Sequence, residues 1–515
     1  MARELASFFV WLILGIRLSE SARILVAAPS PVPSHIMSML PLLNRLSDNG
    51  HYVALLYNSH SSYKKDFGPK IHVHAIDLQG DDVFEAIFND TSQEPDMWSI
   101  EPDSLDMLMG WGFTGHIMGL VLDHRLQDLE KGIAGRWDLL ISDSDFCPEG
   151  PALAGARGLP YLTFHTSRFE EPIGAWHLGL HWPSFGSTPP TFLTRESMAW
   201  HAANFWDRWT SLTKALKFHL ILELPVNYFV YQILRQLEIY DYSLAQFHSG
   251  SSTHVTDYPY KITDPVPFSN ELLELGTTCA EVSGSLEDKD SKMADFVNEP
   301  KSRGTIVVSF GSIIQYDLIS EEVTRALLDI VSSQELREYR ILWSYNGKQR
   351  QSLPDNVMAS KWLPQKELLA HRKTTLFISH GGLKSFKESL CAATPTIFVP
   401  IFGEQFLNAY YGMRQGWASF LDKRDFGNTG HVVGTIVEAL QKAKLRRERA
   451  MHWRDILVDS VRDPLELASF KVEQLLRHTG RMPEKHFYRS STSIYLGEVE
   501  IFAFFIAMVL SIAVK

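Results

Sequence analysis

The sequence predicts an α/β protein with two doubly wound domains, each built on a parallel sheet with helices on both faces. Its 515 residues exceed what one hydrophobic core usually holds. Two long stretches alternate strand-like with helix-like segments, a pattern typical of βαβ units. Between them, residues 279–304 are polar and rich in turn-forming residues, so we predict an inter-domain linker there.

The composition narrows the classes of function before any motif is considered. Hydrophobic residues make up 45% and charged residues 21%, which is ordinary for globular proteins and excludes a disordered chain. The 49 basic and 60 acidic residues give a net charge of −11. Without a long basic run, such a chain is not expected to bind nucleic acid. Three cysteines are too few for a disulfide scaffold.

The first stretch, residues 22–278, contains the expected strands of the first domain. Each is a short apolar run, and they occupy 22–29, 51–57, 70–78, 137–143 and 159–165. A helical pattern follows the first run through Leu46, and a short helix is expected near 151–157. Residues 171–250 are mostly helical in pattern and rich in Trp and Phe.

The second stretch, residues 305–480, repeats this alternation. Its expected strands occupy 305–312, 339–345, 374–382 and 395–400, with a helix at 321–331. Ligands of doubly wound domains bind at the carboxyl ends of the strands. We therefore expect binding residues to follow these strands and to face a cleft between the two domains.

The two ends of the chain are its most apolar parts. Residues 1–21 have the apolar run and the small residues of a signal peptide, and the sequon at Asn89 suits a secreted route. Residues 501–514 carry no charge but are fewer than the about 20 that span a bilayer. Extending to 494–514 includes Glu498 and Glu500. We predict a short or truncated membrane anchor there; the alternative is a buried terminal helix.

Two common nucleotide-binding motifs are absent. The loop after the first strand, APSPVPSH, contains no glycine, whereas a dinucleotide-binding fold carries G-x-G-x-x-G at this point. No G-x-x-x-x-G-K-[ST] loop occurs anywhere in the sequence. These absences disfavour an NAD-dependent enzyme and a P-loop ATPase.

Residues 362–409 contain the densest set of candidate binding residues. His380 and Gly382 lie where a predicted strand ends and a helix begins, and the amides of a helix N-terminus attract phosphate. Ser385, one turn into the helix, can reach a second phosphate oxygen, and Glu388 can accept hydrogen bonds from ribose. Trp362 offers a flat face to a base.

The motifs of this segment resemble the signature of the UDP-glycosyltransferases, the family that includes the UDP-glucuronosyltransferases. The family pattern is W-x-P-Q, then H-x-G-x-x-S-x-x-E, then P-x-x-x-[DE]-Q-x-x-N-A. The matching residues are Trp362, Pro364, Gln365, His380, Gly382, Ser385, Glu388, Pro400, Glu404, Gln405, Asn408 and Ala409. Residues 379–388 look most like the animal membrane-bound branch, and nematode sequences in particular. Many animal members have Asp where Glu404 stands, so the donor sugar stays open.

The resemblance implies a GT-B fold, in which two Rossmann-like doubly wound domains face a cleft, followed by a C-terminal membrane-anchor segment. Residues 22–278 would bind the acceptor. Residues 305–480 would bind the UDP-sugar, and their terminal helix would return to the first domain. The implied donor-site roles are uracil stacking, nucleoside contact, diphosphate binding, ribose binding and contact with the sugar hydroxyls. In that order they fall to Trp362; Gln365; His380, Gly382 and Ser385; Glu388; and Glu404 with Gln405. Ser312 would lie near the phosphates.

The resemblance also implies a catalytic pair in the first domain. His35, just after the first strand, would take the acceptor proton, and Asp143, at the end of a later strand, would orient it. Asp145 is a nearby alternative to Asp143. Asp143-Ser144-Asp145 has the spacing of a D-x-D metal motif, but it falls at the family's catalytic-Asp position, so we expect no metal.

The implied activity is the inverting transfer of glucuronic acid or glucose from a UDP-sugar to hydroxyl groups of small lipophilic acceptors. The UDP-sugar is a co-substrate, and no cofactor is expected. The expected location is the endoplasmic reticulum membrane with the catalytic domains in the lumen, and a homo- or hetero-oligomer is left open. Two alternatives remain: an idle relative that binds UDP-sugar, and a glycosyltransferase specific for a lipid such as ceramide.

A set of aromatic residues bears on the acceptor. It consists of Trp176, Trp182, Phe185, Phe192, Trp200, Phe205, Trp206 and Trp209. Such side chains can bind lipophilic acceptors or lie against a membrane, and they can equally be the core of packed helices.

Overall fold

The structure is a computed structural model. It describes residues 21–28, 33–59, 67–77, 96, 98–99, 124–125, 127–143, 150, 154, 158–166, 189, 195–218, 235, 238, 240, 251–263, 272–279, 284–311, 314–347 and 353–478. Residues 1–20 of the predicted signal peptide, the predicted anchor, the sequon at Asn89, and residues Asp145 and Ser312 lie outside the described residues.

The first half of the chain forms a parallel sheet with strand order β3-β2-β1-β4-β5-β6-β7. Its strands are β1 (Arg23–Ala27), β2 (Tyr52–Ser59), β3 (His72–Asp77), β4 (Leu139–Asp143), β5 (Tyr161–His165), β6 (His254–Thr256) and β7 (Leu272–Glu274). The order changes direction between β1 and β4. At such a switch point the connections leave the two neighbouring strands toward opposite faces, which opens a place for a ligand at the carboxyl ends.

The second half forms another parallel sheet with strand order β10-β9-β8-β11-β12-β13. Its strands are β8 (Thr305–Ser309), β9 (Arg340–Ser344), β10 (Val357–Ser360), β11 (Thr374–Ser379), β12 (Thr396–Phe398) and β13 (Ala418–Phe420). Here the switch point falls between β8 and β11. Every residue of β8 is buried, as expected for a central strand covered on both faces.

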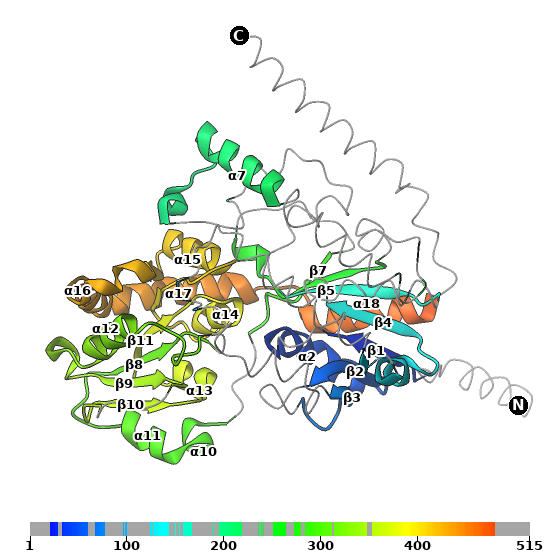
Figure 1. Cartoon of the computed structure of the whole chain (residues 1–515), viewed down its shortest axis with the longest axis horizontal. Coiled ribbons are helices and arrows are strands. Elements are labelled where there is room, and N and C mark those ends of the chain that lie inside the picture. The colour runs from blue at the N-terminus through cyan, green and yellow to red at the C-terminus, as the bar shows by residue number, and fades with distance from the viewer. Residues whose placement is uncertain are drawn as a thin grey trace, which may run out of the picture.

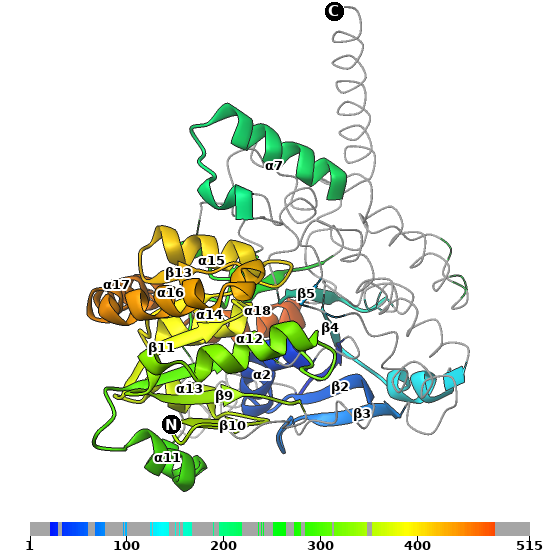
Figure 2. The same cartoon turned by 60° about the vertical axis from the view of Figure 1, so that its left-hand side comes forward.

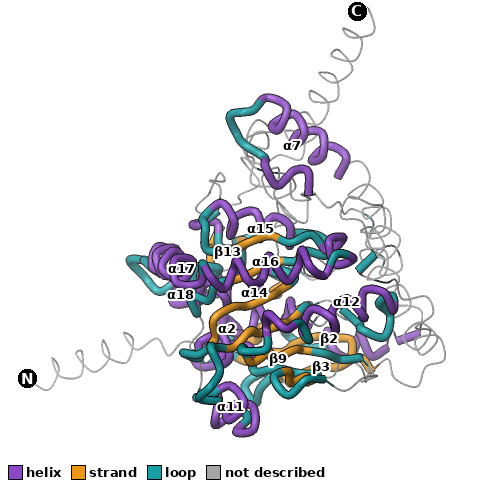
Figure 3. The backbone as a smooth tube through the Cα atoms, turned by 90° about the vertical axis from the view of Figure 1, so that its left-hand side faces the viewer, coloured by secondary structure: helices purple, strands orange, loops and turns teal. Residues whose placement is uncertain are grey.

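Helices cover both sheets, and Figure 3 shows them wrapped around the strands. They are α2 (Pro33–Asp48), α7 (Phe205–Phe218), α10 (Leu286–Lys289), α11 (Ser291–Val297), α12 (Glu321–Val331), α13 (Gln365–Ala370), α14 (Leu383–Cys391), α15 (Gln405–Arg414), α16 (Thr429–Gln441), α17 (Ala443–Val458) and α18 (Pro464–His478). α7 stands away from both sheets (Figure 2).

Residues 279–304, where the polar composition predicts a linker, contain the short helices α10 and α11. Ser285 and Asp288 form a capping box at the start of α10, and Asp290 caps α11. The apolar residues of these helices, Leu286 and Met293 among them, pack with Val307 of β8. This stretch is therefore attached to the second sheet over most of its length.

The last described helix returns to the first sheet. Ala468, Val472 and Leu475 of α18 belong to the same apolar cluster as Ile36 of α2, and Figure 1 shows α18 beside α2. At the surface, Asn49 donates a hydrogen bond from its Nδ2 to Oε1 of Glu473 over 2.6 Å. The chain thus passes from the first sheet to the second through the linker and returns to the first with α18.

The first half of the chain, in turn, contributes a residue to the core of the second sheet. Trp98, from the first half of the chain, is 4% exposed and lies in the core of the second sheet. Its ring makes edge contacts with Phe310 and Phe426, at centroid distances of 5.4 and 5.1 Å. Asp96 holds the local turn by accepting hydrogen bonds from the Trp98 amide and the Ser99 hydroxyl. A residue of the first half therefore completes the core of the second.

The strands expected from the sequence are all present, within a few residues of the expected ends. Four further strands, β6, β7, β10 and β13, were not expected. Each has three or four residues, too few to show a periodic pattern. Among the described residues, no helix combines the length and the apolar character needed to cross a bilayer.

Candidate active site

The predicted catalytic pair is brought together at the switch point of the first sheet. His35 is the third residue of α2, which follows β1, and Asp143 is the last residue of β4. Pro33 begins the helix, a position where its missing amide hydrogen costs nothing. Nδ1 of His35 lies 2.8 Å from Oδ2 of Asp143, which is completely buried.

This contact sets the orientation and the tautomer of His35. A carboxylate can only accept, so Nδ1 of His35 carries the hydrogen, and in the neutral ring Nε2 then has the lone pair. The side chain of His35 is 12% exposed, whereas that of Asp143 is inaccessible. A histidine held in this way can take a proton at Nε2, with the resulting imidazolium stabilised by the buried carboxylate.

Thr166 is a third member of this group that the sequence did not reveal. It follows β5, the neighbour of β4, and its hydroxyl contacts the same Nδ1 of His35. A polar residue directly after a buried strand is the only sequence signal for it, and many residues share that signal. The position next to His35 depends on the order of the strands, which the sequence does not state.

A second group of predicted residues lies at the switch point of the second sheet. His380 follows β11 and Gly311 follows β8, and these two strands are neighbours. A Cβ on Gly311 would lie 2.7 Å from Cε1 of His380, and one on Gly382 would lie 2.6 Å from its Nε2. Any side chain at either glycine would displace the ring. Gly311 also has a φ of +76°, which favours glycine.

The His380 ring is held in the neutral state. Burial lowers the pKa of His380 to about 4, against a smaller opposing effect of the Ser309 backbone. Its Nδ1 is buried and has no hydrogen-bond partner among the described residues. A neutral imidazole with an unsatisfied nitrogen is suited to a hydrogen bond with a ligand.

The N-terminus of α14 lies directly after this histidine. Gly382 is its N-cap residue, and no side chain caps the first turn. The leading amides of a nine-residue helix therefore remain available, and they carry a partial positive charge. His380 and these amides can bind the same anion, as the sequence predicts for a diphosphate.

Gln365, Ser385 and Glu388 form a hydrogen-bonded cluster between α13 and α14. Nε2 of Gln365 donates to Oε2 of Glu388 over 2.7 Å and to Oγ of Ser385 over 3.2 Å. Burial raises the pKa of the Glu388 carboxyl, and the hydrogen bond from Gln365 opposes that effect. The structure thus places three predicted nucleotide-binding residues in contact with one another.

The other predicted donor-site residues differ in how they are presented. Trp362 is 69% exposed, so a face of its indole is accessible to a base. Glu404 is the N-cap residue of α15. Gln405 is buried, and its Oε1 accepts hydrogen bonds from the amides of Ile401 and Phe402. A contact between Gln405 and a sugar would therefore use its amide nitrogen.

Among the described members of the aromatic set of residues 176–209, some side chains are buried and others are exposed. Trp200 is buried in the cluster of α14, α15 and α17, and its indole nitrogen donates to the Asp207 carbonyl. Phe205 and Trp206, on α7, are 57% and 69% exposed. One member is thus core, and two are available for contact with an apolar molecule.

Acidification is expected to remove a stabilising contribution of His380. The unfolded chain binds a proton on this residue near pH 6.5 and the folded chain only near pH 4. Between these values the unfolded state holds more protons, so the free energy of unfolding falls as the pH falls. The difference corresponds to about 3 kcal/mol.

Urea unfolding of the wild type and of His380→Gln, from pH 7 to pH 4, measures this contribution. The profile of the variant should be flatter. Burial raises the pKa of Glu274 to about 7, which gives the opposite slope, but that slope is common to both proteins. Parallel profiles would contradict the neutral, buried state of His380.

The chain is similar to known proteins over most of its length. The profile of the family described as UDP-glucoronosyl and UDP-glucosyl transferase matches residues 189–514, more than half of the sequence. UDP-glucuronosyltransferase 1A6 of Mus musculus is 25% identical over 499 residues, which cover 93% of this chain and 87% of the relative. The 2-hydroxyacylsphingosine 1-beta-galactosyltransferase of the same species is 23% identical, covering 92% and 83%.

Solved structures agree at the level of the fold. The crystal structure of the glycotransferase of kitacinnamycin superposes with a TM-score of 0.59 at 14% identity, covering 89% of this chain and all of that one. At this identity the likeness shows a common architecture of two parallel-sheet, Rossmann-like domains, the GT-B fold.

Proposed function

Because the chain belongs to the UDP-glucuronosyl and UDP-glucosyl transferase family and is a UDP-sugar glycosyltransferase, we propose that it transfers glucuronic acid or glucose to hydroxyl groups of small lipophilic acceptors. The observation that supports this most directly is the 2.8 Å contact between His35 and Asp143. This contact supports His35 as the base in the first domain, while the residues suited to a nucleotide lie in the second.

The proposed step is a single inverting displacement. The acceptor hydroxyl gives its proton to Nε2 of His35 while its oxygen bonds to the anomeric carbon. The bond from that carbon to the diphosphate oxygen breaks, and UDP leaves with the electron pair. Attack from the face opposite the diphosphate inverts the anomeric centre. Asp143 stabilises the imidazolium that forms.

The donor would lie along β11, α13 and α14. We propose that uracil stacks on Trp362 and that Gln365 contacts the nucleoside. Ribose would bind Glu388, and the diphosphate would bind His380, Ser385 and the amides after Gly382. The leaving charge is met by uncapped helix amides and hydrogen-bond donors, so the proposed mechanism needs no metal and no cofactor. Glu404, Gln405 and Ser312 are proposed contacts of the sugar and phosphates.

We also propose a division of labour and a location. Residues 22–278 would bind the acceptor and residues 305–480 the UDP-sugar, with the sites facing the lumen of the endoplasmic reticulum. The disulfide between Cys279 and Cys391 supports a lumenal location, since disulfides persist in oxidising compartments. Membrane attachment rests on the apolar segment 494–514.

A donor and acceptor panel tests the function. Membranes holding the protein are incubated with a phenol or with a 2-hydroxyacyl ceramide, each with UDP-glucuronic acid, UDP-glucose and UDP-galactose, and the products are weighed. A phenolic glucuronide or glucoside is the expected product. Galactosylceramide would instead favour the activity named for the sphingosine-specific relative. Binding of UDP without any conjugate would indicate an idle relative.

A further inference from the structure

Helix α14 has two sides with different partners. On one side, Ser385 and Glu388 meet Gln365 within the second domain. On the other side, Lys387 and Cys391 meet residues that follow β6 and β7 of the first sheet. The helix proposed to hold the nucleotide is therefore also joined to Asp257 of the first domain and to Cys279, where the linker leaves that domain.

The first fastening is an ion pair between the two halves. Nζ of Lys387 lies 2.5 Å from Oδ1 of Asp257, and the side chains are only 13% and 11% exposed. Asp257 follows directly on β6, and the chain after β7 packs closely against it, because a Cβ on Gly276 would lie 2.4 Å from the Asp257 carbonyl oxygen. A pair so removed from water has a fixed geometry, and losing one partner leaves a buried charge unpaired.

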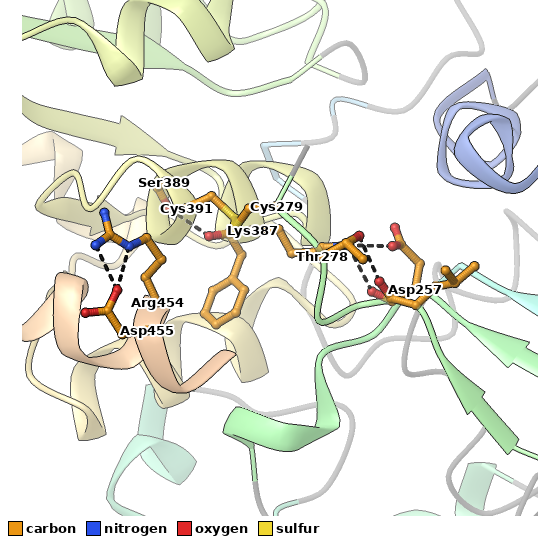
Figure 4. The surroundings of a disulfide bond; sticks show 10 residues. Asp257, Thr278, Cys279, Lys387, Ser389, Cys391, Arg454 and Asp455 are labelled. Carbon is orange, nitrogen blue, oxygen red and sulfur yellow. Dashed lines mark hydrogen bonds and ion pairs between the residues drawn. A yellow bond between two sulfur atoms is a disulfide. The ribbon is translucent and has the colours of Figure 1, made fainter. Parts of the chain in front are cut away.

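The second fastening is covalent. Cys391, the last residue of α14, is joined to Cys279, which lies 112 positions earlier and five residues after the end of β7. Figure 4 shows the disulfide together with Asp257 and with Lys387, which lies on the same helix as Cys391. We call the ion pair and the disulfide the α14 tethers.

Apolar packing accompanies the tethers. Phe386 and Leu390 of α14 are completely buried and share a cluster with Trp200 and Ile262 from the first half of the chain. Burial of apolar surface stabilises the contact of α14 with the first half but specifies poorly which atoms meet, because the hydrophobic effect is not directional. An ion pair and a disulfide, in contrast, each fix specific atoms. The tethers therefore add contacts between specific atoms to this apolar packing.

We propose that Lys387, Asp257, Cys279 and Cys391 are positioning residues that align the nucleotide-bearing helix with the first sheet, and through it the donor sugar with His35. The proposal rests on the proposed function. The nucleotide contacts are all made within the second domain, so losing the tethers should leave UDP affinity nearly unchanged. Transfer, in contrast, depends on groups from both domains, and a misplacement of about 1 Å can lower its rate about 100-fold.

The experiment removes the tethers singly and together. Asp257→Asn with Lys387→Met removes the ion pair without leaving a lone buried charge. Cys279→Ser with Cys391→Ser removes the disulfide. A quadruple variant removes both. For each protein, kcat, the donor KM and the affinity for UDP are measured at a temperature where the protein is folded.

Because either tether can hold the helix, each pairwise variant should keep kcat within about threefold of the wild type. The quadruple variant should lose about 10- to 100-fold in kcat, more than the product of the two single losses, with UDP affinity within about threefold. Losses that simply multiply, or a loss of UDP affinity that accounts for the lower rate, would overturn the proposal.

Reduction of the disulfide in the folded protein tests the same proposal without the quadruple variant. If the quadruple variant does not fold, the ion-pair variant is folded with its disulfide intact and then treated with dithiothreitol, beside the wild type treated in the same way. Only the ion-pair variant should lose turnover. If the wild type itself binds UDP but forms no conjugate, the proposed function fails. If it turns over and all variants match it, only the tether proposal fails.

Discussion

Replacing His35 with alanine is expected to lower kcat by about 10²- to 10⁴-fold while leaving UDP affinity unchanged. In the proposed mechanism His35 takes the acceptor proton at Nε2, and its Nδ1 contacts the buried Asp143. The groups suited to hold UDP come from β11, α13 and α14 of the other domain. The loss should therefore appear in turnover and not in nucleotide binding.

Asp143→Asn provides the companion measurement. An amide can donate to Nδ1, which would turn the imidazole to the tautomer with its hydrogen on Nε2 and remove the base. We expect a loss of similar size, with a double variant no worse than His35→Ala alone, because the pair acts as a unit. The matched control is His72→Ala, an exposed histidine at the start of β3. Near-normal turnover in His35→Ala would exclude it as the base.

The second large effect is expected from Gly382→Ala. The new methyl carbon would lie 2.6 Å from Nε2 of His380, closer than real contacts allow, so the ring must move. The backbone itself can accept alanine, since Gly382 has a φ of −58°. Losing a hydrogen bond to a charged phosphate corresponds to about 1.5 to 3 kcal/mol, so UDP affinity should fall about 10- to 100-fold.

Gly434→Ala is the matched control for this substitution. Gly434 lies within α16, and an added Cβ would meet nothing within 4 Å. Alanine there should leave UDP binding unchanged and raise stability by up to about 1 kcal/mol through helix propensity. Titration of both variants with UDP measures the contrast. Equal affinities would place the His380 ring away from the diphosphate.

The fold could be predicted from the sequence because its central strands are mostly apolar and buried. β1, β4, β8 and β11 each contain an uninterrupted apolar run, and in β5 only Thr163 interrupts it. The strands β6 and β7 lack that run, so the edge of the first sheet was not foreseen. Two of the tether residues, Asp257 and Cys279, follow these edge strands, which explains why the tethers were missed as well.

The residues of the candidate site likewise include some that could be predicted from the sequence and others that could not. His380, Gly382, Ser385 and Glu388 lie on one continuous segment, so their spacing in the sequence already describes their spacing in space. Thr166 reaches His35 from 131 positions away, through the pairing of strands and not through any local pattern. The disulfide is similar, because three cysteines allow several pairings and only the packing of α14 against the first domain selects one.

The position of Trp98 bears on how the protein is made. Trp98 is synthesised long before Phe310 and Phe426, yet in the folded protein its ring contacts both of them. Trp98 can therefore be buried only after the second half of the chain has been synthesised and its core forms around the indole. A fragment that begins at the linker would carry a hole the size of an indole, and truncating such a side chain costs about 3 to 5 kcal/mol. We therefore expect the two sheets to unfold together and not as independent domains.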